Sequence, residues 1–423
     1  MGKSKRVPVI RFKGFTEEWE EKEFSNTFSP LNNNTLSRAE LNYENGSTKN
    51  IHYGDVLIKF GENLDVSKEE LPYITNEKIV GKYNLLQDGD IVFADAAEDE
   101  TVGKCTELLN VLNERIVSGL HTIACRPLFT FANRYLGYYL NASIFHNQLL
   151  PLMQGTKVFS VSKSAIKNTI IYYPELAEQK QIGEFFQNVD NLINVNQRKL
   201  EKLKNIKKAC LEKMFPKKGA TIPEIRFKGF SGEWEEMRLD SLTSYKNGKG
   251  HETKQTSEGK YELINLNSVS IDGGLKPSGR FIEEATETLQ QDDLVMVLSD
   301  VGHGDLLGRV ALIPENNRFV LNQRVALLRP TGYASSSFLF YCINANQQYF
   351  KKQGAGSSQL NISKESVETF IAGVPNPEEQ ERIGIFFKNL DNLIAKNELQ
   401  LEKLKNIKKA CLEKMFVNTE DAI

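Results

Sequence analysis

The sequence predicts two α/β (α+β) domains joined by two long helices that form an antiparallel coiled coil, with the chain built as an internal pseudo-two-fold duplication. Three observations predict this fold class. A short signature starts each half of the chain, a long helical signature ends each half, and the segments between them have a mixed α/β pattern. Self-similarity at this scale decides the architecture.

The start signature is nearly identical in its two copies. PVIRFKGF at residues 8–15 recurs as PEIRFKGF at residues 223–230, and EWEE follows each copy. The only two tryptophans of the chain, Trp19 and Trp234, are therefore equivalent. Each half of the chain begins with the same local structure.

The helical signature at the end of each half is stronger. Residues 182–215 and 383–416 align without a gap and are identical at 26 of 34 positions. Apolar residues recur at alternating steps of four and three, which is the seam of a coiled coil. At 1.5 Å per residue, each helix makes a rod of about 50 Å.

One seam position is polar in both copies, Asn196 and Asn397, near the middle of each helix. Either these are tolerated core polar residues, or they pair across an antiparallel coiled coil and fix its register, as buried asparagines do elsewhere. The second half of each helix is also basic. That pattern fits a solvated face or the proximity of DNA or an acidic partner.

The two segments between the signatures scarcely match, and both are mixed α/β. β-rich runs at residues 55–60, 90–93 and 294–298 predict strands, and helices are expected at 135–150 and 336–350. Faint echoes remain between the halves: LQDGD at residue 86 resembles LQQDD at 289, and CRP at 125 resembles LRP at 328. One fold with two different surfaces is predicted.

The predicted organisation follows from the two signatures. The first domain is 1–178 with start segment 8–24, the central spacer helix 179–216, the second domain 217–378 with start segment 223–239, the distal spacer helix 379–416, and the tail 417–423. Nothing in the sequence has the apolar length of a signal peptide or a bilayer span, so a cytoplasmic protein that does not associate with a membrane is expected. A net charge of −2 argues against coating nucleic acid by bulk positive charge. Five widely spaced cysteines without a CxxC pair suggest neither a disulfide framework nor a metal site.

The two-copy layout, the RFKGF and EWEE starts, and the IGxFFxNxDNLI openings of the helices resemble the specificity subunits of Type I restriction-modification systems, which act in host defence. The resemblance covers essentially the whole chain. It implies two target recognition domains that each read one half of a split sequence in double-stranded DNA, with the coiled coil setting the gap. It also implies a non-catalytic chain that docks two modification (methyltransferase) subunits and restriction/translocase subunits. No cofactor is expected on this chain; S-adenosylmethionine, ATP and Mg²⁺ are expected in the partners.

Residues that read DNA are sought on polar loops, since base edges and phosphates are contacted by amide, hydroxyl and basic groups. One such loop lies just before each long helix, and the glycines in these two loops permit close approach of the backbone to DNA. The candidates there are Thr156, Lys157, Ser160 and Lys163 in the first copy and Gly356, Ser357, Ser358, Gln359, Asn361 and Lys364 in the second. Alternatively, Ser162 and Ser363 simply cap the helices that follow.

A second pair of loops opens each insert. Its candidates are Arg38, Tyr43 and Lys49 in the first copy and Lys246, Lys249, His251 and Lys254 in the second. An ordinary solvated loop is the alternative for each of them. Acidic loops at residues 95–100 and 300–305 are poor neighbours for phosphate and are interpreted as solvated turns.

Catalytic motifs are not found: the sequence has no GxGxxG after a strand, no phosphate-binding GxxxxGK[ST] loop, no HExxH, no GxSxG and no NPPF or DPPY. The chain is therefore not expected to be an enzyme by itself. Two alternatives remain: a duplicated protein-protein scaffold without DNA specificity, and a nuclease whose site uses scattered carboxylates such as Asp95, Asp300 and Asp305.

Overall fold

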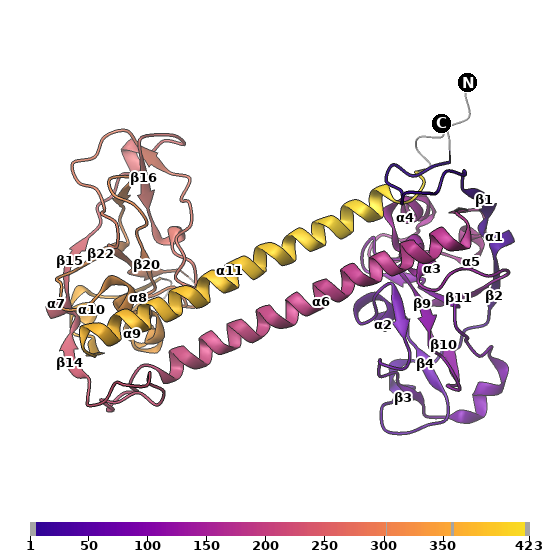
Figure 1. Cartoon of the computed structure of the whole chain (residues 1–423), viewed down its shortest axis with the longest axis horizontal. Coiled ribbons are helices and arrows are strands. Elements are labelled where there is room, and N and C mark those ends of the chain that lie inside the picture. The colour runs from indigo at the N-terminus through magenta and orange to yellow at the C-terminus, as the bar shows by residue number, and fades with distance from the viewer. Residues whose placement is uncertain (1–5, 302, 357–358, 419–423) are drawn as a thin grey trace. The chain divides into compact units, whose positions relative to one another are not determined.

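The computed structural model of the protein describes residues 6–301, 303–356 and 359–418, and for residues 77–79 the backbone alone. The chain forms two compact units: unit 1 contains residues 1–197 and 400–423, and unit 2 contains residues 198–399. The long helices α6 (Leu176–Lys213) and α11 (Pro377–Lys414) each have one half in each unit (Figure 1). The units thus divide the chain within the helices, whereas the predicted domain boundaries lie at the helix ends.

Unit 1 has a five-stranded sheet in the order β2-β11-β7-β9-β5, a four-stranded sheet in the order β10-β4-β6-β3, and two-stranded pairs β1-β13 and β12-β8. Its strands are β1 (Glu20–Glu23), β2 (Phe28–Leu31), β3 (Leu41–Asn42), β4 (Lys49–Ile51), β5 (Asn63–Asp65), β6 (Tyr73–Ile74), β7 (Ile91–Ala94), β8 (Ala96–Ala97), β9 (Cys105–Leu109), β10 (Ile116–Ser118), β11 (Thr122–Pro127), β12 (Phe159–Ser160) and β13 (Ile170–Tyr173). Its shorter helices are α1 (Phe24–Thr27), α2 (Tyr53–Ile58), α3 (Tyr135–Asn141), α4 (Ser143–Leu149) and α5 (Lys163–Ile166).

Unit 2 repeats this plan with a four-stranded sheet β15-β22-β18-β20, a three-stranded sheet β17-β16-β21, and pairs β14-β24 and β19-β23. Its strands are β14 (Glu235–Arg238), β15 (Thr243–Asn247), β16 (Tyr261–Ile264), β17 (Phe281–Ile282), β18 (Leu294–Val297), β19 (Ser299–Asp300), β20 (Val310–Leu312), β21 (Phe319–Leu321), β22 (Val325–Pro330), β23 (Leu360–Asn361) and β24 (Ile371–Val374). Its shorter helices are α7 (Leu239–Leu242), α8 (Ser336–Ala345), α9 (Gln347–Gln353) and α10 (Lys364–Glu368).

The main sheets of the two units correspond strand by strand. The order β2-β11-β7-β9 in unit 1 matches β15-β22-β18-β20 in unit 2, and β5 is an additional strand of unit 1. The sequence echoes lie directly before β7 and β18 and at the ends of β11 and β22, and they form one interaction in each unit. Arg126 binds Asp90 through two hydrogen bonds of 2.7 Å, and Arg329 binds Asp293 in the same way. The duplicated fold and the strands at 90–93 and 294–298 are thus confirmed.

The predicted strand at residues 55–60 is wrong, because residues 55–58 belong to helix α2. The His52 ring caps this helix by accepting from the Gly54 N–H at 3.2 Å. Val56 and Phe60 are buried while Ile58 is 88% exposed, and a spacing of four between buried residues suits a helix. A short apolar run cannot distinguish a strand from a buried helical turn.

The helices expected at 135–150 and 336–350 are each broken into two, α3 and α4 or α8 and α9. Asn141, at the end of α3, accepts from the Cys105 N–H at 3.0 Å and donates to the Cys105 carbonyl at 2.8 Å. Asn344 makes the same two bonds to Val310, at 3.2 and 3.1 Å. One asparagine per unit thus ties the helix to strand β9 or β20, which fixes the place where the helix ends.

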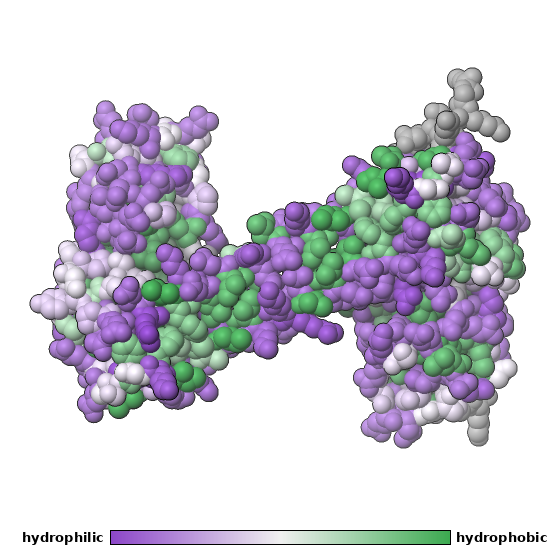
Figure 2. All heavy atoms as spheres, viewed as in Figure 1, coloured by the Kyte–Doolittle hydropathy of each residue, from purple (hydrophilic) through white to green (hydrophobic). Residues whose placement is uncertain are grey.

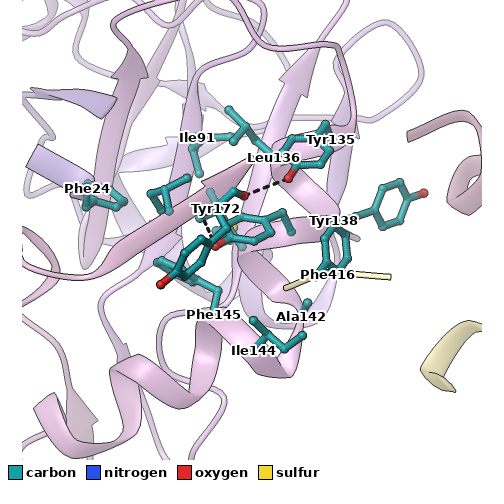
Figure 3. Close-up of a cluster of buried hydrophobic side chains, with 14 of the residues drawn as sticks. Phe24, Ile91, Tyr135, Leu136, Tyr138, Ala142, Ile144, Phe145, Tyr172 and Phe416 are labelled. Carbon is teal, nitrogen blue, oxygen red and sulfur yellow. Dashed lines mark hydrogen bonds between the residues drawn. The ribbon is translucent and has the colours of Figure 1, made fainter. Parts of the chain in front are cut away.

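The long helices run antiparallel within each unit. In unit 1, Phe186 near the start of α6 stacks on Phe416, just beyond the end of α11, with ring centroids 5.9 Å apart. In unit 2, Phe387 of α11 stacks on Phe215, just beyond the end of α6, at 6.0 Å. Figure 3 shows Phe416 among the aromatic side chains of the unit 1 core, where Tyr135 donates to the Tyr172 carbonyl at 3.0 Å. Each domain therefore completes its core with the end of the other half's helix.

The start signature is fastened to the long helix by an ion pair that the sequence analysis missed. Arg11 donates to both carboxylate oxygens of Glu178 at 2.7 Å, and the Glu178 side chain is 1% exposed. Arg226 binds Glu379 with the same two distances in unit 2. This arginine clasp explains why the arginine occurs in both copies of the start signature.

The seam asparagines Asn196 and Asn397 are both buried. Asn196 donates from its amide to the Leu192 carbonyl of its own helix at 2.8 Å. The residues belong to different units, so their pairing stays a prediction.

Candidate nucleic-acid interface

In each unit, three segments lie side by side and are joined by backbone hydrogen bonds. In unit 1 the Asp95 N–H donates to the His121 carbonyl at 3.0 Å, and the Val161 N–H donates to the Asp95 carbonyl at 2.9 Å. In unit 2 the Leu298 N–H donates to the Arg324 carbonyl and the Ile362 N–H to the Leu298 carbonyl, both at 2.9 Å. We call this arrangement the three-segment surface: residues 119–121, 95–97 and 159–161 in unit 1, and 322–324, 298–300 and 360–362 in unit 2.

The loop before each long helix reaches out from this surface. Gln154 and Ser160 exchange two backbone hydrogen bonds of 2.9 and 2.8 Å, which close the loop at its base. Gly155 has φ +120° and Gly356 has φ +134°, and a Cβ on either would collide with a carbonyl oxygen inside its own loop. These glycines are required by the turn, and they leave Thr156 and Lys157 exposed at the tip. Ser357 and Ser358 lie outside the described residues.

Ser162 and Ser363 cap the helices that follow them, which is the alternative role considered from the sequence. The Ser162 hydroxyl accepts from the Ala165 N–H at 3.1 Å, and the Ser363 hydroxyl accepts from the Ser366 N–H at 3.0 Å. The helices α5 and α10 then place Lys163 and Lys364 at equivalent positions, both exposed.

Lys163 belongs to a polar group beside the three-segment surface of unit 1. Its ammonium donates to Asn33 Oδ1 at 2.9 Å. His121 Nδ1 lies 3.2 Å from Asp95 Oδ1. Burial raises the pKa of Asp95, and the charges of His121 and Lys163 oppose that shift. The acidic loop at 95–100 is thus not simply a solvated turn, because Asp95 is held by neighbouring basic groups.

The candidate DNA-contacting residues on the first loop of unit 1 do not form one cluster. Arg38 forms two hydrogen bonds with Asp55, at 2.8 and 2.9 Å, and this partner raises the pKa of the guanidinium. Tyr43 is 46% exposed. The Lys49 side chain is only 13% exposed and its ammonium lies 3.0 Å from Glu114. Arg38 and Lys49 are therefore engaged within the protein.

The candidates on the first loop of unit 2 are gathered into one cleft. The cleft has a volume of about 140 Å³, and its lining includes Lys246, Lys249, His251 and Lys254. Lys246 forms an ion pair with Glu287, which also lines the cleft. Glu284 also lines the cleft, so its charge is mixed, and Lys249, His251 and Lys254 are the side chains there that suit phosphate.

Gln359 and Asn361 lie next to each other on the three-segment surface of unit 2. The Ser299 hydroxyl donates to Asn361 Oδ1 at 2.7 Å, and Gln359 donates to the same serine. Lys364 lies over the Tyr245 ring, with its ammonium 5.4 Å from the centroid. The side chains of Gln359 and Asn361 are thus joined to Ser299 by hydrogen bonds.

The carboxylates considered for a nuclease are each engaged within their own unit. Asp95 is in unit 1, whereas Asp300 and Asp305 are in unit 2. Asp300 accepts from the Leu306 N–H at 3.2 Å, and Asp305 pairs with Lys351 at 2.7 Å. Within residues 6–301, 303–356 and 359–418, no three His, Cys, Asp or Glu side chains are grouped as metal ligands.

The sequence analysis did not single out His121 or Arg324. Both residues have positive φ, 52° and 66°, and both are exposed. The signal available in the sequence was indirect: each stands four residues before the echoed CRP or LRP, so the two are equivalent.

Exposed apolar side chains occur along the long helices, and Figure 2 shows hydrophobic patches among hydrophilic residues there. The equivalent residues Leu192 and Leu393 are 53% and 50% exposed, and Ile206 and Ile407 are both 39% exposed. In the described part of the chain, neither these helices nor any other is apolar enough over a sufficient length to span a membrane.

Comparison with known proteins agrees with the duplicated fold. The family model described as the Type I restriction modification DNA specificity domain matches residues 16–205 and 231–406. The Type I restriction enzyme MjaVIII specificity subunit of Methanocaldococcus jannaschii is 26% identical over 275 residues, an alignment covering 60% of this chain and 63% of that relative. The chain thus spans just under two thirds of that relative. The putative Type I restriction enzyme MjaX specificity subunit of the same organism is 23% identical, with 93% of this chain and 91% of the relative covered.

Solved structures agree on the fold over nearly the full length. The S subunit of the Type I restriction-modification system from M. genitalium has a TM-score of 0.59 at 14% identity, covering 97% of this chain and 99% of that one. A chain from a structure of Type I restriction-modification complex assembly has a TM-score of 0.54 at 16% identity, covering 94% of this chain and 97% of that one. Two matches to one domain, one in each half, show that this chain belongs to the family of Type I restriction-modification DNA specificity proteins.

Proposed function

We propose that this chain reads a bipartite sequence in double-stranded DNA, one half-site per unit, and directs methyltransferase and restriction subunits to it. The observation that carries the proposal is that one buried frame occurs twice while the side chains on its three-segment surfaces differ. His121 and Asp95 of unit 1 stand where Arg324 and Leu298 stand in unit 2. Two surfaces with different polar groups suit two different half-sites.

The predicted contact residues are part of this proposal, with different roles. Thr156, Lys157 and Ser160 of unit 1, and Gln359 and Asn361 of unit 2, lie on or beside the three-segment surfaces, where they would reach DNA. Lys249, His251 and Lys254 line the cleft of unit 2 and suit phosphate contacts. The two long helices would set the unread gap between the half-sites.

The partner subunits would dock on the long helices. Exposed Leu and Ile side chains on otherwise charged helices are the kind of apolar surface that subunit interfaces cover. Since Leu192 and Leu393 are equivalent, two copies of one modification subunit could bind. Leu192→Glu is expected to weaken assembly with the methyltransferase subunit at least tenfold, whereas the neighbouring exposed Asn194→Glu should not. Equal affinity of both variants, measured by ultracentrifugation, would place the docking surface elsewhere.

Chemistry would reside in the partners. In this proposal S-adenosylmethionine binds the modification subunits, and ATP and Mg²⁺ bind the restriction subunits. This chain contributes position and sequence selection, and is not itself an enzyme.

One experiment tests the proposed function against its alternatives. The purified chain is mixed with its adenine methyltransferase partner and genomic DNA, and methylated positions are mapped. The proposal predicts methylation confined to a split sequence only when the chain is present. Unchanged target choice would favour a scaffold, and cutting by the chain alone with a divalent metal would identify a nuclease.

A further inference from the structure

We propose that His121 and Arg324 determine sequence specificity, each by contacting a base edge in the half-site read by its own unit. This inference rests on the proposed function and deepens it. It starts from a backbone conformation that both units share. His121 and Arg324 occupy equivalent turns, directly before β11 and β22, with φ of 52° and 66°.

A left-handed conformation is unfavourable for residues with a Cβ, and glycine is the usual residue there. Another pair of equivalent left-handed positions has glycine in one unit only: Gly89 in unit 1, with φ +82°, and Asp292 in unit 2, with φ +67°. At the left-handed position directly before β11 and β22, neither unit has glycine, and the polar side chains of both residues are exposed. Residues in sparsely populated conformations cluster at functional sites.

The turns are held rigidly from several sides. In unit 1 the Gly119 N–H donates to the Ile51 carbonyl at 2.8 Å, and the His121 carbonyl accepts from Asp95. In unit 2 the Asn322 N–H donates to the Ile264 carbonyl at 2.9 Å, and the Gly248 N–H donates to the Val325 carbonyl at 3.0 Å. A side chain on such a turn projects from a fixed point, which is what the reading of a base edge requires.

The two side chains differ in what they can recognise. The His121 ring packs edge-on against Tyr53, with centroids 5.3 Å apart, and its Nδ1 faces Asp95. With Nδ1 donating to that carboxylate, Nε2 is left to accept a hydrogen bond, as from the exocyclic amine of adenine or cytosine. Arg324 has a guanidinium suited to bidentate donation to guanine O6 and N7.

The test removes each side chain while keeping the observed backbone conformation favourable. His121→Gly and Arg324→Gly remove the reading groups at positions where glycine adopts the observed φ more easily. Leu112→Gly (φ 48°) and Asp292→Gly (φ 67°) are matched controls outside the three-segment surface. Each variant is assembled with the methyltransferase partner, and methylation is measured on a library in which every half-site base is varied, alongside thermal unfolding.

We expect His121→Gly to relax the preference at an adenine or cytosine of one half-site by about 5-fold to 100-fold, and Arg324→Gly to relax it similarly at a guanine of the other. The reading variants should stay folded and unfold in one thermal transition, and the preferences of the control variants should not change. Unchanged base preference in an assembled, active complex would overturn the inference, as would a uniform loss of methylation on all sequences, and in both cases the proposed function would stand. If the unsubstituted complex has no split target, the proposed function fails, and the inference fails with it.

Discussion

Unit 1 and unit 2 agree in what they bury and differ in what they expose. Both enclose a tryptophan of the start signature, a phenylalanine beyond the end of the opposite helix, and an arginine clasp on a buried glutamate. At the three-segment surface they share only backbone geometry. The interior needs the same side chains because close packing tolerates few shapes, whereas an exposed turn constrains its side chain little.

One internal position also differs, and it shows how a shared frame accommodates variation. Glu107 of β9 is buried and accepts from the N–H groups of Arg134 and Gly137 at 2.7 and 2.8 Å, at the start of α3. In unit 2 the equivalent residue is Leu312, and the Ser335 hydroxyl caps α8 by accepting from the Phe338 N–H at 3.3 Å. The same helix start is satisfied by different chemistry in each unit.

The largest predicted effect tests the common frame. Arg11→Ala should destabilise unit 1 by about 3–5 kcal/mol, because it leaves the buried Glu178 carboxylate without a partner. Arg226→Ala should destabilise unit 2 at least as much, because Arg226 also donates to the Gly232 carbonyl, while Lys13→Ala, at an exposed residue, should have almost no effect. Hydrogen exchange of each unit measures this. A loss in only one of the two units would contradict a shared frame.

A smaller effect distinguishes the two helix starts by pH. Burial raises the pKa of Glu107 to about 7, from an ordinary 4.5. Folding therefore favours the protonated carboxyl, and its contribution is fully present below pH 4.5 and lost as the pH rises through about 7. The loss is at most about 3 kcal/mol.

Glu107→Gln should remove this slope, which denaturant unfolding followed in unit 1 between pH 4.5 and 8 would detect. Unit 2, with Leu312 at this position, serves as the internal control. A difference between the variant and the unsubstituted chain that does not depend on pH would contradict the assignment.

The smallest effect concerns a lysine that both units use. Lys408 pairs with Glu62 and Asp190, both at 2.7 Å, whereas the equivalent Lys207 pairs with Asp391 at 2.6 Å. Lys408→Met should cost unit 1 about 2 kcal/mol and Lys207→Met should cost unit 2 about 1 kcal/mol, since partly buried pairs fall between exposed and buried ones. Equal costs in thermal unfolding would mean that Glu62 adds nothing.

The sequence predicted the duplication, the long helices and their antiparallel pairing because identical residues and a heptad seam are visible without coordinates. The helix breaks at Asn141 and Asn344 were not predicted, since each depends on a bond to a strand distant in sequence. The arginine clasp was missed for the same reason, although Arg11 with Arg226 and Glu178 with Glu379 are repeat equivalents that could have suggested it.

The candidate site was predicted at the level of loops rather than residues. The loop at 154–160 and the basic loop of unit 2 are where polar groups gather, but Lys49 and Arg38 are engaged by carboxylates that no local pattern reveals. A positive φ at a histidine or arginine cannot be recognised from the sequence. His121 and Arg324 could therefore be identified only from the fold.

The central claim is that each unit reads its own half-site on a common frame. The most direct measurement exchanges residues 24–175 for the corresponding insert of a relative and maps methylation by the assembled complex. The account predicts that one half-site changes while the other half-site and the gap between them stay the same. A change in both half-sites would contradict it.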